Sequence, residues 1–462
     1  MKYNLLLCRL IFVVVLFMVL RDDTINQTML VPMDLRNLIP EDHPCYFIKN
    51  VVDQIDCSQA NRVFADRPGE FAYPRELLLR LILMSVFDGG LSSREIERKT
   101  RTDIAYMYLA GMQHPSYRTI ARFKVDYPDL IDESFKTTIK IAKEEDLVKI
   151  HHVSLDGTKI KAKTSMNKLT NEQQLKIMKQ HLKESIELDE EEDMELGEES
   201  GKDVISINDS DACFMKNKKG KWEFDYNGQI AVDDYKGIIL ASYITNNSTD
   251  YYELIPLMEQ VQSNLSEIYD ETPVNYQVSA DNGYSTDMNT EYLEQNGFDG
   301  YISSRKLSRE QKKYNLSDKP FAKDNFFYDN EMMTYIRPLG QPLYKISEYT
   351  YKNKSRISHW TKECKTCPMQ LFCSKGNRCR VIQDYGIPSK IRMQRKMETP
   401  EAKERYKIRS KTAERPFAHL KQNMHLTEFR TTGLQEVNTE LKLYTIGHNL
   451  KRIYNEISRK NN

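Results

Sequence analysis

Three acidic residues in this 462-residue chain stand in settings that suit metal-dependent chemistry. Asp156 in HHVSLDGTKIKAK and Asp281 in YQVSADNGYS each come at or near the end of a short stretch typical of a strand entering a core. Glu414 lies much further along, in RSKTAERPFAHLKQNM. Carboxylates at two neighbouring strand ends, with a third from a helix, would form a hard-oxygen site for a pair of Mg2+ ions and for phosphoryl transfer on DNA. The alternative is that these acids are solvated turn residues, since Asp favours turns.

The sequence around these acids resembles the DDE transposases of bacterial insertion sequences. The likeness extends from about Leu38 to Ile453 and is carried by SLDGTKIKA, YNGQIAVDDYKGIILASYITNNSTDYYELIPLMEQ, ADNGYS, RSKTAERPFAHLKQNM and HNLKRI. The resemblance implies an α/β fold with a ribonuclease H-like catalytic domain. It also implies that Asp156, Asp281 and Glu414 bind two Mg2+ or Mn2+ ions.

A reaction and its partners follow from the same resemblance. A metal-activated water would hydrolyse a phosphodiester at the transposon end, and the freed 3'-hydroxyl would then attack target DNA in line. Transposon-end DNA and target DNA are therefore the expected partners, in the cytoplasm, and no small-molecule cofactor is expected. A homodimer is expected because two ends must be cut together. A catalytically inactive, transposase-derived DNA-binding protein remains the alternative.

The segment that contains Glu414 matches a further signature of these transposases. The family carries Tyr, Arg, Glu and Lys here, and Tyr406, Arg409, Glu414 and Lys421 match that order with one extra residue between Arg409 and Glu414. A spacing of seven residues places Glu414 and Lys421 on one stripe of a helix. Pro416 is expected in a first turn or at a bend, because an interior proline removes a backbone donor.

Charge is distributed unevenly along the chain although the net charge is zero. Residues 172–199 hold eleven acids and three Lys, whereas residues 351–462 hold twenty-five Lys or Arg and ten acids. A phosphate backbone would bind the basic part with salt-sensitive affinity. The DNA-binding candidates in this part are Arg409, Lys411, Arg415 and Lys421. A solvated basic helical face is the alternative.

Residues 38–150 read as a helical DNA-binding domain. An apolar helix is predicted at 75–89, and Ser92 with Glu95 spells a capping box that opens the next helix. The segment 114–124 predicts the last helix of a helix-turn-helix-like unit, which would present basic side chains to a major groove. Those side chains are Arg118, Arg122 and Lys124.

Residues 1–28 form an apolar N-terminal extension. Its run at 5–20 is shorter than the roughly 20 residues that span a bilayer and is broken by Arg9. The length also suits a signal sequence, although no small-residue cleavage site follows. Membrane association is therefore not the favoured interpretation, and a membrane-tethered or secreted protein directed by residues 5–20 is kept as an alternative.

The expected catalytic part begins at residues 151–300 and contains an acidic insertion at 170–203. Strands are predicted at GQIAVD and IILASYIT around a turn at 234–237, followed by a crossover helix and by the strand before Asp281. Asp250, at the junction between strand and helix, is expected to cap that helix rather than to bind a metal. Residues 301–395 are expected to be a β-rich, Cys-containing insertion, and residues 396–455 the C-terminal helical part.

Four cysteines in the insertion are candidates for a structural zinc site: Cys364, Cys367, Cys373 and Cys379. A C-x2-C pair with two further cysteines suits tetrahedral Zn2+ in a cytosolic protein. The alternative is a set of reduced structural cysteines. The family often has a further Cys where this chain has Arg337, which weakens the prediction of a complete zinc site.

Overall fold

The computed structural model describes residues 34–62, 72–164, 206, 209–216, 220–303, 321, 326–329, 331–351, 354–374 and 379–461. The N-terminal extension 1–28 and the acidic insertion 170–203 lie outside these residues. Within them, no helix has the length and apolar character needed to cross a membrane. Residues 1–41 form one unit, which contains the 3-10 helix η1 (Leu35–Leu38), and residues 42–462 form the second.

The second unit begins with a helical region. Its helices are α1 (Pro44–Val52), α2 (Ser58–Arg62), α3 (Arg75–Phe87), α4 (Ser93–Thr102), α5 (Ile104–Leu109), α6 (Tyr117–Asp126) and α7 (Pro128–Glu144). α3 is buried on almost every side and ends before Gly89 and Gly90, whose φ angles are positive. The predicted capping box of α4 is present between Ser92 and Glu95. The helical character expected for this region is confirmed.

A mixed sheet forms the core that follows the helical region. Its strands are β1 (His152–Lys161), β2 (Cys213–Lys216), β3 (Trp222–Asp233), β4 (Ile239–Thr245), β5 (Gln277–Ala280) and β6 (Asp299–Ile302). β3 pairs antiparallel with β1, β2 and β4, while β5 pairs parallel with β1 and β6. Apart from the short strand β2, the sheet has three antiparallel strands, β1, β3 and β4, followed by the two parallel strands β5 and β6. This is the arrangement expected for the ribonuclease H-like fold, and that prediction is confirmed.

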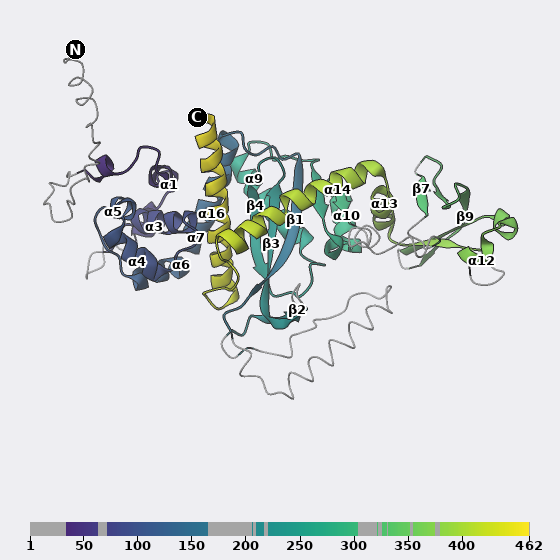
Figure 1. The fold of residues 1–462 in the computed structure, drawn as a ribbon, viewed down its shortest axis with the longest axis horizontal. Coiled ribbons are helices and arrows are strands. Elements are labelled where there is room, and N and C mark those ends of the chain that lie inside the picture. The colour runs from purple at the N-terminus through teal and green to yellow at the C-terminus, as the bar shows by residue number, and fades with distance from the viewer. Residues whose placement is uncertain are drawn as a thin grey trace, which may run out of the picture. The chain divides into compact units, whose positions relative to one another are not determined.

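Helices cover both faces of this sheet (Figure 1). Tyr243 of β4 donates to Glu253, which precedes α9 (Leu254–Ile268). Ser242 precedes Tyr243 in β4, and its hydroxyl oxygen lies 3.2 Å from the hydroxyl oxygen of Thr445 in α16 (Leu434–Asn461). Because successive strand side chains point to opposite faces, α9 and α16 pack on opposite sides of β4. η3 (Asn282–Tyr284) and α10 (Asp287–Gln295) connect β5 to β6.

α16 joins the sheet to the helical region. The side chain of Asn449 is fully buried, accepts from the Ile239 backbone N–H at 2.9 Å, and donates to the Ile239 carbonyl and to the hydroxyl of Thr138 in α7. A Cβ on Gly447 would come within 2.7 Å of the carbonyl oxygen of Val86 in α3, so only glycine allows this close approach. Gly447 and Asn449 of α16 therefore hold α3, α7 and β4 together.

A second sheet follows β6. Its strands are β7 (Phe327–Asp329), β8 (Thr334–Ile336), β9 (Pro342–Tyr351), β10 (Lys354–Trp360) and β11 (Ile382–Gly386), in the order β11-β10-β9-β8-β7. η6 (Lys362–Thr366) and α12 (Gln370–Cys373) lie between β10 and β11. The chain then returns to the core through α13 (Pro388–Lys396), α14 (Pro400–Thr412), α15 (Glu414–Ala418) and the π-helix η7 (His419–Asn423).

Candidate active site

The parallel pairing of β1 and β5 sets Asp156 and Asp281 side by side. Ser154 is opposite Ser279 in the register, and their hydroxyl oxygens are 3.1 Å apart, so both point to the same face of the sheet. Asp281 continues β5 with an extended backbone, φ −78° and ψ −178°. Since side chains alternate along a strand, Asp156 and Asp281, each two residues further on, lie on that same face.

Arg409 of α14 occupies the face that carries these acids. Its Nη2 lies 2.7 Å from Asp156 Oδ1, its Nε donates to the Leu155 carbonyl at 3.2 Å, and both paired side chains are only 8% exposed. Burial alone would lower the pKa of Arg409, but Asp156, Tyr406 and Asp281 outweigh that effect and raise it. The guanidinium therefore stays charged and supplies the positive charge that the two aspartates require.

Two buried tyrosines complete this side of the site. Tyr406 of α14 and Tyr284 of η3 are 5% and 0% exposed. Burial, chiefly, raises the pKa of both phenols, and the neighbouring Asp156 and Asp281 carboxylates raise it further. Both phenols therefore remain neutral. Tyr284 donates to Gln229 Oε1.

The expectation that Asp250 caps the crossover helix is wrong. α9 has Glu253 at its N-cap, without a side-chain cap bond. The Asp250 carboxylate instead accepts from Asn227 Nδ2 and Gln229 Nε2, each at 2.7 Å. The alternating polar residues of β3, in an otherwise buried strand, were the signal in the sequence that could have indicated this network.

Glu414 is placed differently from the two aspartates. It begins α15 after a one-residue break at Ala413, where Pro416 prevents α14 from continuing as a regular helix. Its side chain is exposed, and within the part of the chain that the structure describes it has no hydrogen bond or ion pair. Lys421, by contrast, donates to the hydroxyl of Thr158 at 2.7 Å and to the Lys159 carbonyl at 2.8 Å, two and three residues beyond Asp156.

The carboxylates of the site supply some of the ligands that a divalent cation needs. Asp156 and Asp281 provide hard oxygen ligands at adjacent strand positions, and the buried guanidinium of Arg409 shows that this place is stable only with positive charge. Among the described residues, no group of three or more His, Cys, Asp or Glu side chains is arranged to hold a metal ion.

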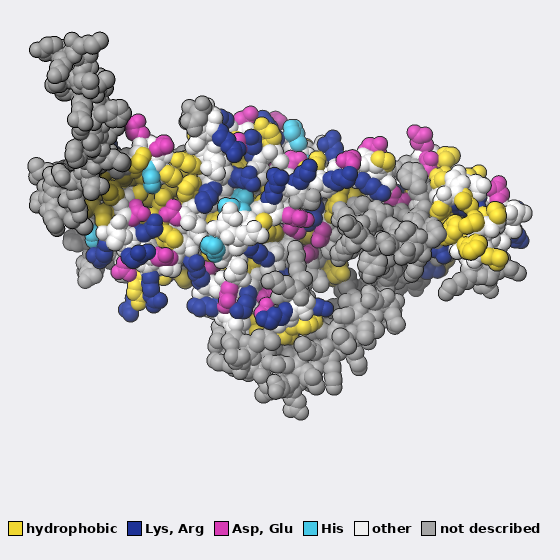
Figure 2. Space-filling model, in the orientation of Figure 1, with side chains coloured by type: hydrophobic (Ala, Val, Ile, Leu, Met, Phe, Trp, Pro, Cys, Tyr) yellow, Lys and Arg dark blue, Asp and Glu magenta, His cyan; other side chains and the backbone are white. Residues whose placement is uncertain are grey.

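The basic candidates divide into exposed and buried groups. Arg118, Arg122, Lys411 and Arg415 are exposed. Lys124 is half-buried, because α6 packs on the core through Ile120 and Phe123, so it does not lie on the outer side of α6 as expected. Arg409 is buried against Asp156 and does not belong to the basic surface. Figure 2 shows Lys and Arg side chains along α14 and over α16 on the face in view.

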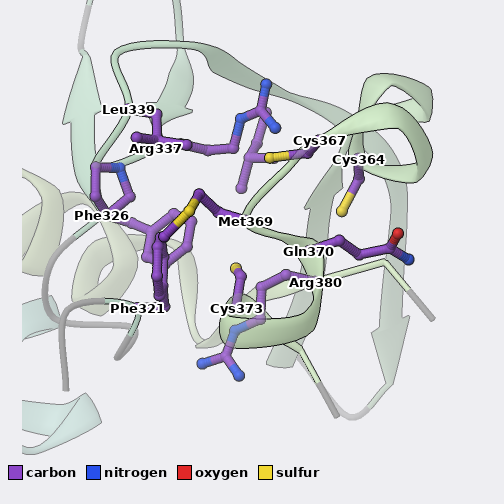
Figure 3. A pocket seen from close by; sticks show the side chains of 12 residues that line it. Phe321, Phe326, Arg337, Leu339, Cys364, Cys367, Met369, Gln370, Cys373 and Arg380 are labelled. Carbon is purple, nitrogen blue, oxygen red and sulfur yellow. The ribbon is translucent and has the colours of Figure 1, made fainter. Parts of the chain in front are cut away.

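The four insertion cysteines do not form the predicted zinc site among the described residues. All four are free thiols, and Cys364, Cys367 and Cys373 line one pocket together with Arg337 and Arg380 (Figure 3). Burial raises the pKa of Cys373, Arg380 opposes this effect, and the neighbouring Cys364 and Cys367 raise the pKa further. Where related transposases place a Cys, this chain places the cation of Arg337, and a guanidinium repels a divalent metal.

Comparisons with known proteins agree with this geometry. Residues 338–454 match a family model described as a transposase DDE domain, and residues 33–126 match one described as a transposase domain of the DUF772 family. No curated protein matches the chain.

Two solved structures are similar at low identity. A piggyBac transposase synaptic complex with hairpin DNA is 10% identical, covers 92% of this chain and 77% of its own, and has a TM-score of 0.34. A pre-cleavage Mos1 transpososome is 11% identical, covers 55% of this chain and 67% of its own, and has a TM-score of 0.18. At these TM-scores neither likeness supports an inference about this chain.

Proposed function

Because this chain is a DDE transposase, an enzyme that acts on DNA, we propose that Asp156, Asp281 and Glu414 bind its catalytic divalent ions, two Mg2+ or Mn2+, and that it cleaves transposon ends and joins them to target DNA. The observation that carries this proposal is the β1–β5 register, which sets Asp156 and Asp281 on one face at adjacent strand positions. The exposed carboxylate of Glu414 is the third ligand in this proposal.

The side chains around the acids have distinct roles. When bound, the cations would lower the pKa of a water and stabilise charge on the scissile phosphate. Arg409 orients Asp156 through its two bonds to β1. Lys421 holds its ammonium two residues beyond Asp156, where it would meet a phosphate oxygen. Lys411 and Arg415, which are exposed near the same helix junction, would contact the DNA backbone and give salt-dependent affinity.

Glu414 must approach the aspartates when DNA or metal binds. The break at Ala413 and the π-helix that follows α15 make this part of the helix irregular, so a small rotation of α15 moves the carboxylate without disturbing α14. α6, with Arg118 and Arg122 exposed, is the proposed contact of the helical region with transposon-end DNA. A homodimer in the cytoplasm, with an insertion-sequence end on each protomer, completes the proposal.

The test is cleavage of a DNA duplex that carries the element's own terminal sequence, with Mg2+ or Mn2+ and with a chelator. Asp156→Asn and Asp281→Asn should each lose cleavage by about 10³-fold or more, as expected for loss of a metal-binding carboxylate. Asp146→Asn is the matched control, because Asp146 lies on an exposed turn and its side chain, among the described residues, bonds Lys149 alone. Cleavage that persists in Asp156→Asn, or in chelator, would refute the metal-dependent mechanism.

A further inference from the structure

We infer that Asp250 is a positioning residue that fixes the Asp281 loop against β1, so that the distance between the two aspartates is set by a buried polar network rather than by the backbone alone. This inference rests on the proposed metal-binding role of Asp156 and Asp281. It assigns a function to a side chain outside the acidic triad.

One oxygen of Asp250 is anchored on β3. Oδ1 accepts from both Asn227 and Gln229 at 2.7 Å. These residues are 1% and 0% exposed, and they alternate along β3, so both amides point to the face opposite Asp156. A buried amide that lacks its acceptor is destabilising, so the two donors hold the Asp250 carboxylate in place.

The network then continues into the Asp281 loop. Gln229 uses its Nε2 for Asp250 and its Oε1 for the hydroxyl of Tyr284, so the amide has one allowed orientation. Tyr284 is fully buried and ends η3, three residues after Asp281. Asp281 in turn accepts from the backbone N–H of Gly283 at 2.8 Å. The orientation of the Asp281 loop is therefore linked, bond by bond, to Asp250.

Two glycines leave the space that this arrangement needs. A Cβ on Gly157, the residue after Asp156, would lie 2.6 Å from Asp250 Oδ1 and 2.6 Å from Gln229 Nε2. A Cβ on Gly283 would lie 3.0 Å from Asp281 Oδ1 and 3.3 Å from Asp250 Oδ2. Asp250 therefore packs beside Gly157, which follows Asp156, and beside Gly283, two residues after Asp281.

The contacts predict different outcomes for two substitutions of Asp250. Asp250→Ala removes the acceptor of Asn227 and Gln229, which frees the Gln229 amide and the Tyr284 hydroxyl. Asp250→Asn keeps one oxygen in the Oδ1 position and removes only the charge. A positioning role therefore survives in the Asn variant, whereas a direct metal-binding role would be lost in both.

The experiment measures single-turnover cleavage of the terminal-sequence duplex across a Mn2+ titration. Asp250→Ala should be slower by about 10–100-fold, with a higher Mn2+ concentration for half-maximal rate, as found for residues that orient metal ligands. Asp250→Asn should recover most of that loss. Tyr284→Phe, which removes one hydroxyl at the other end of the network, should shift the Mn2+ dependence in the same direction. Asp270→Ala, at the exposed far end of α9, is the matched control.

Urea unfolding of each variant separates positioning from misfolding, and Tyr284→Phe keeps the test valid if Asp250→Ala does not fold. Wild-type cleavage and Mn2+ dependence in Asp250→Ala would overturn the inference, and so would an Asp250→Asn variant as impaired as Asp250→Ala. Asp156→Asn is run alongside. Cleavage by that variant would refute the proposed function itself, which is a separate result.

Discussion

Replacing Arg409 by methionine should destabilise the catalytic core strongly. The guanidinium lies 2.7 Å from Asp156, and both side chains are 8% exposed, so the substitution leaves a buried carboxylate without its partner. Removing one member of a buried ion pair costs about 3–5 kcal/mol. The bond from Arg409 Nε to the Leu155 carbonyl is also lost, which places the expected decrease in the free energy of unfolding at the upper part of that range.

The double variant Asp156→Asn with Arg409→Met isolates the charge effect. With both charges removed, no uncompensated carboxylate remains, and most of the loss should be recovered. Because Arg409 stands where positive charge is required, Mn2+ should also stabilise the Arg409→Met protein more than the wild type. Saturation at 100 times the dissociation constant contributes about 2.7 kcal/mol.

The assay is urea unfolding followed by tryptophan fluorescence. The chain has two tryptophans, Trp222 in β3 and Trp360 in β10, so a Trp360→Phe background reports on the catalytic sheet alone. An Arg409→Met protein as stable as the background, or a double variant no more stable than Arg409→Met, would show that the pair does not hold the core as described.

Three further predictions concern pH, the third acid and DNA affinity. Burial lowers the pKa of His419 to about 4 and of His448 to about 3, so the unfolded chain takes up protons first as the pH falls below about 6.5. The difference in stability between the wild type and a His419→Gln, His448→Gln variant should therefore fall from pH 6.5 toward pH 4, by up to about 1.4 kcal/mol per pH unit for each imidazole. The comparison removes the opposite effect of Asp225 and Asp233, whose pKa values burial raises to about 6 and about 7, and a difference that stays constant with pH in urea unfolding would contradict this. Glu414→Gln should abolish cleavage in the duplex assay, whereas Glu404→Gln, on the exposed face of α14, should not; equal activity would remove Glu414 from the site. Lys411→Ala should reduce the slope of log affinity against log salt by about 0.9 if it contacts one phosphate, and an unchanged slope in filter binding would exclude that contact.

The parts of the fold that sequence patterns predicted are those with local causes. The Ser92 capping box and the turn at 234–237 each depend on residues a few positions apart, and the structure contains both. The sheet order followed because a strand, a crossover helix and a parallel strand permit few arrangements.

The parts that were not predicted depend on partners distant in the sequence. A basic residue in a basic segment reads as a DNA contact, yet Arg409 pairs with an acid 253 positions away. Asp250 reads as a cap because of its place before a helix, whereas the pairing of β3 with β4, the strand that precedes Asp250, brings Gln229 to it. The cysteine spacing suggested zinc, whereas the guanidinium of Arg337 enters the same pocket through the fold of the insertion.

The place of α16 between α3, α7 and β4 has a consequence for biosynthesis. Asn449 must insert its amide between Thr138 and Ile239, so the sheet and the helical region cannot lock together until α16 has left the ribosome. Nascent chains that already contain Asp156 and Asp281 therefore hold an unfinished core. Competence to cut DNA would therefore depend on synthesis of α16, long after both aspartates have been made.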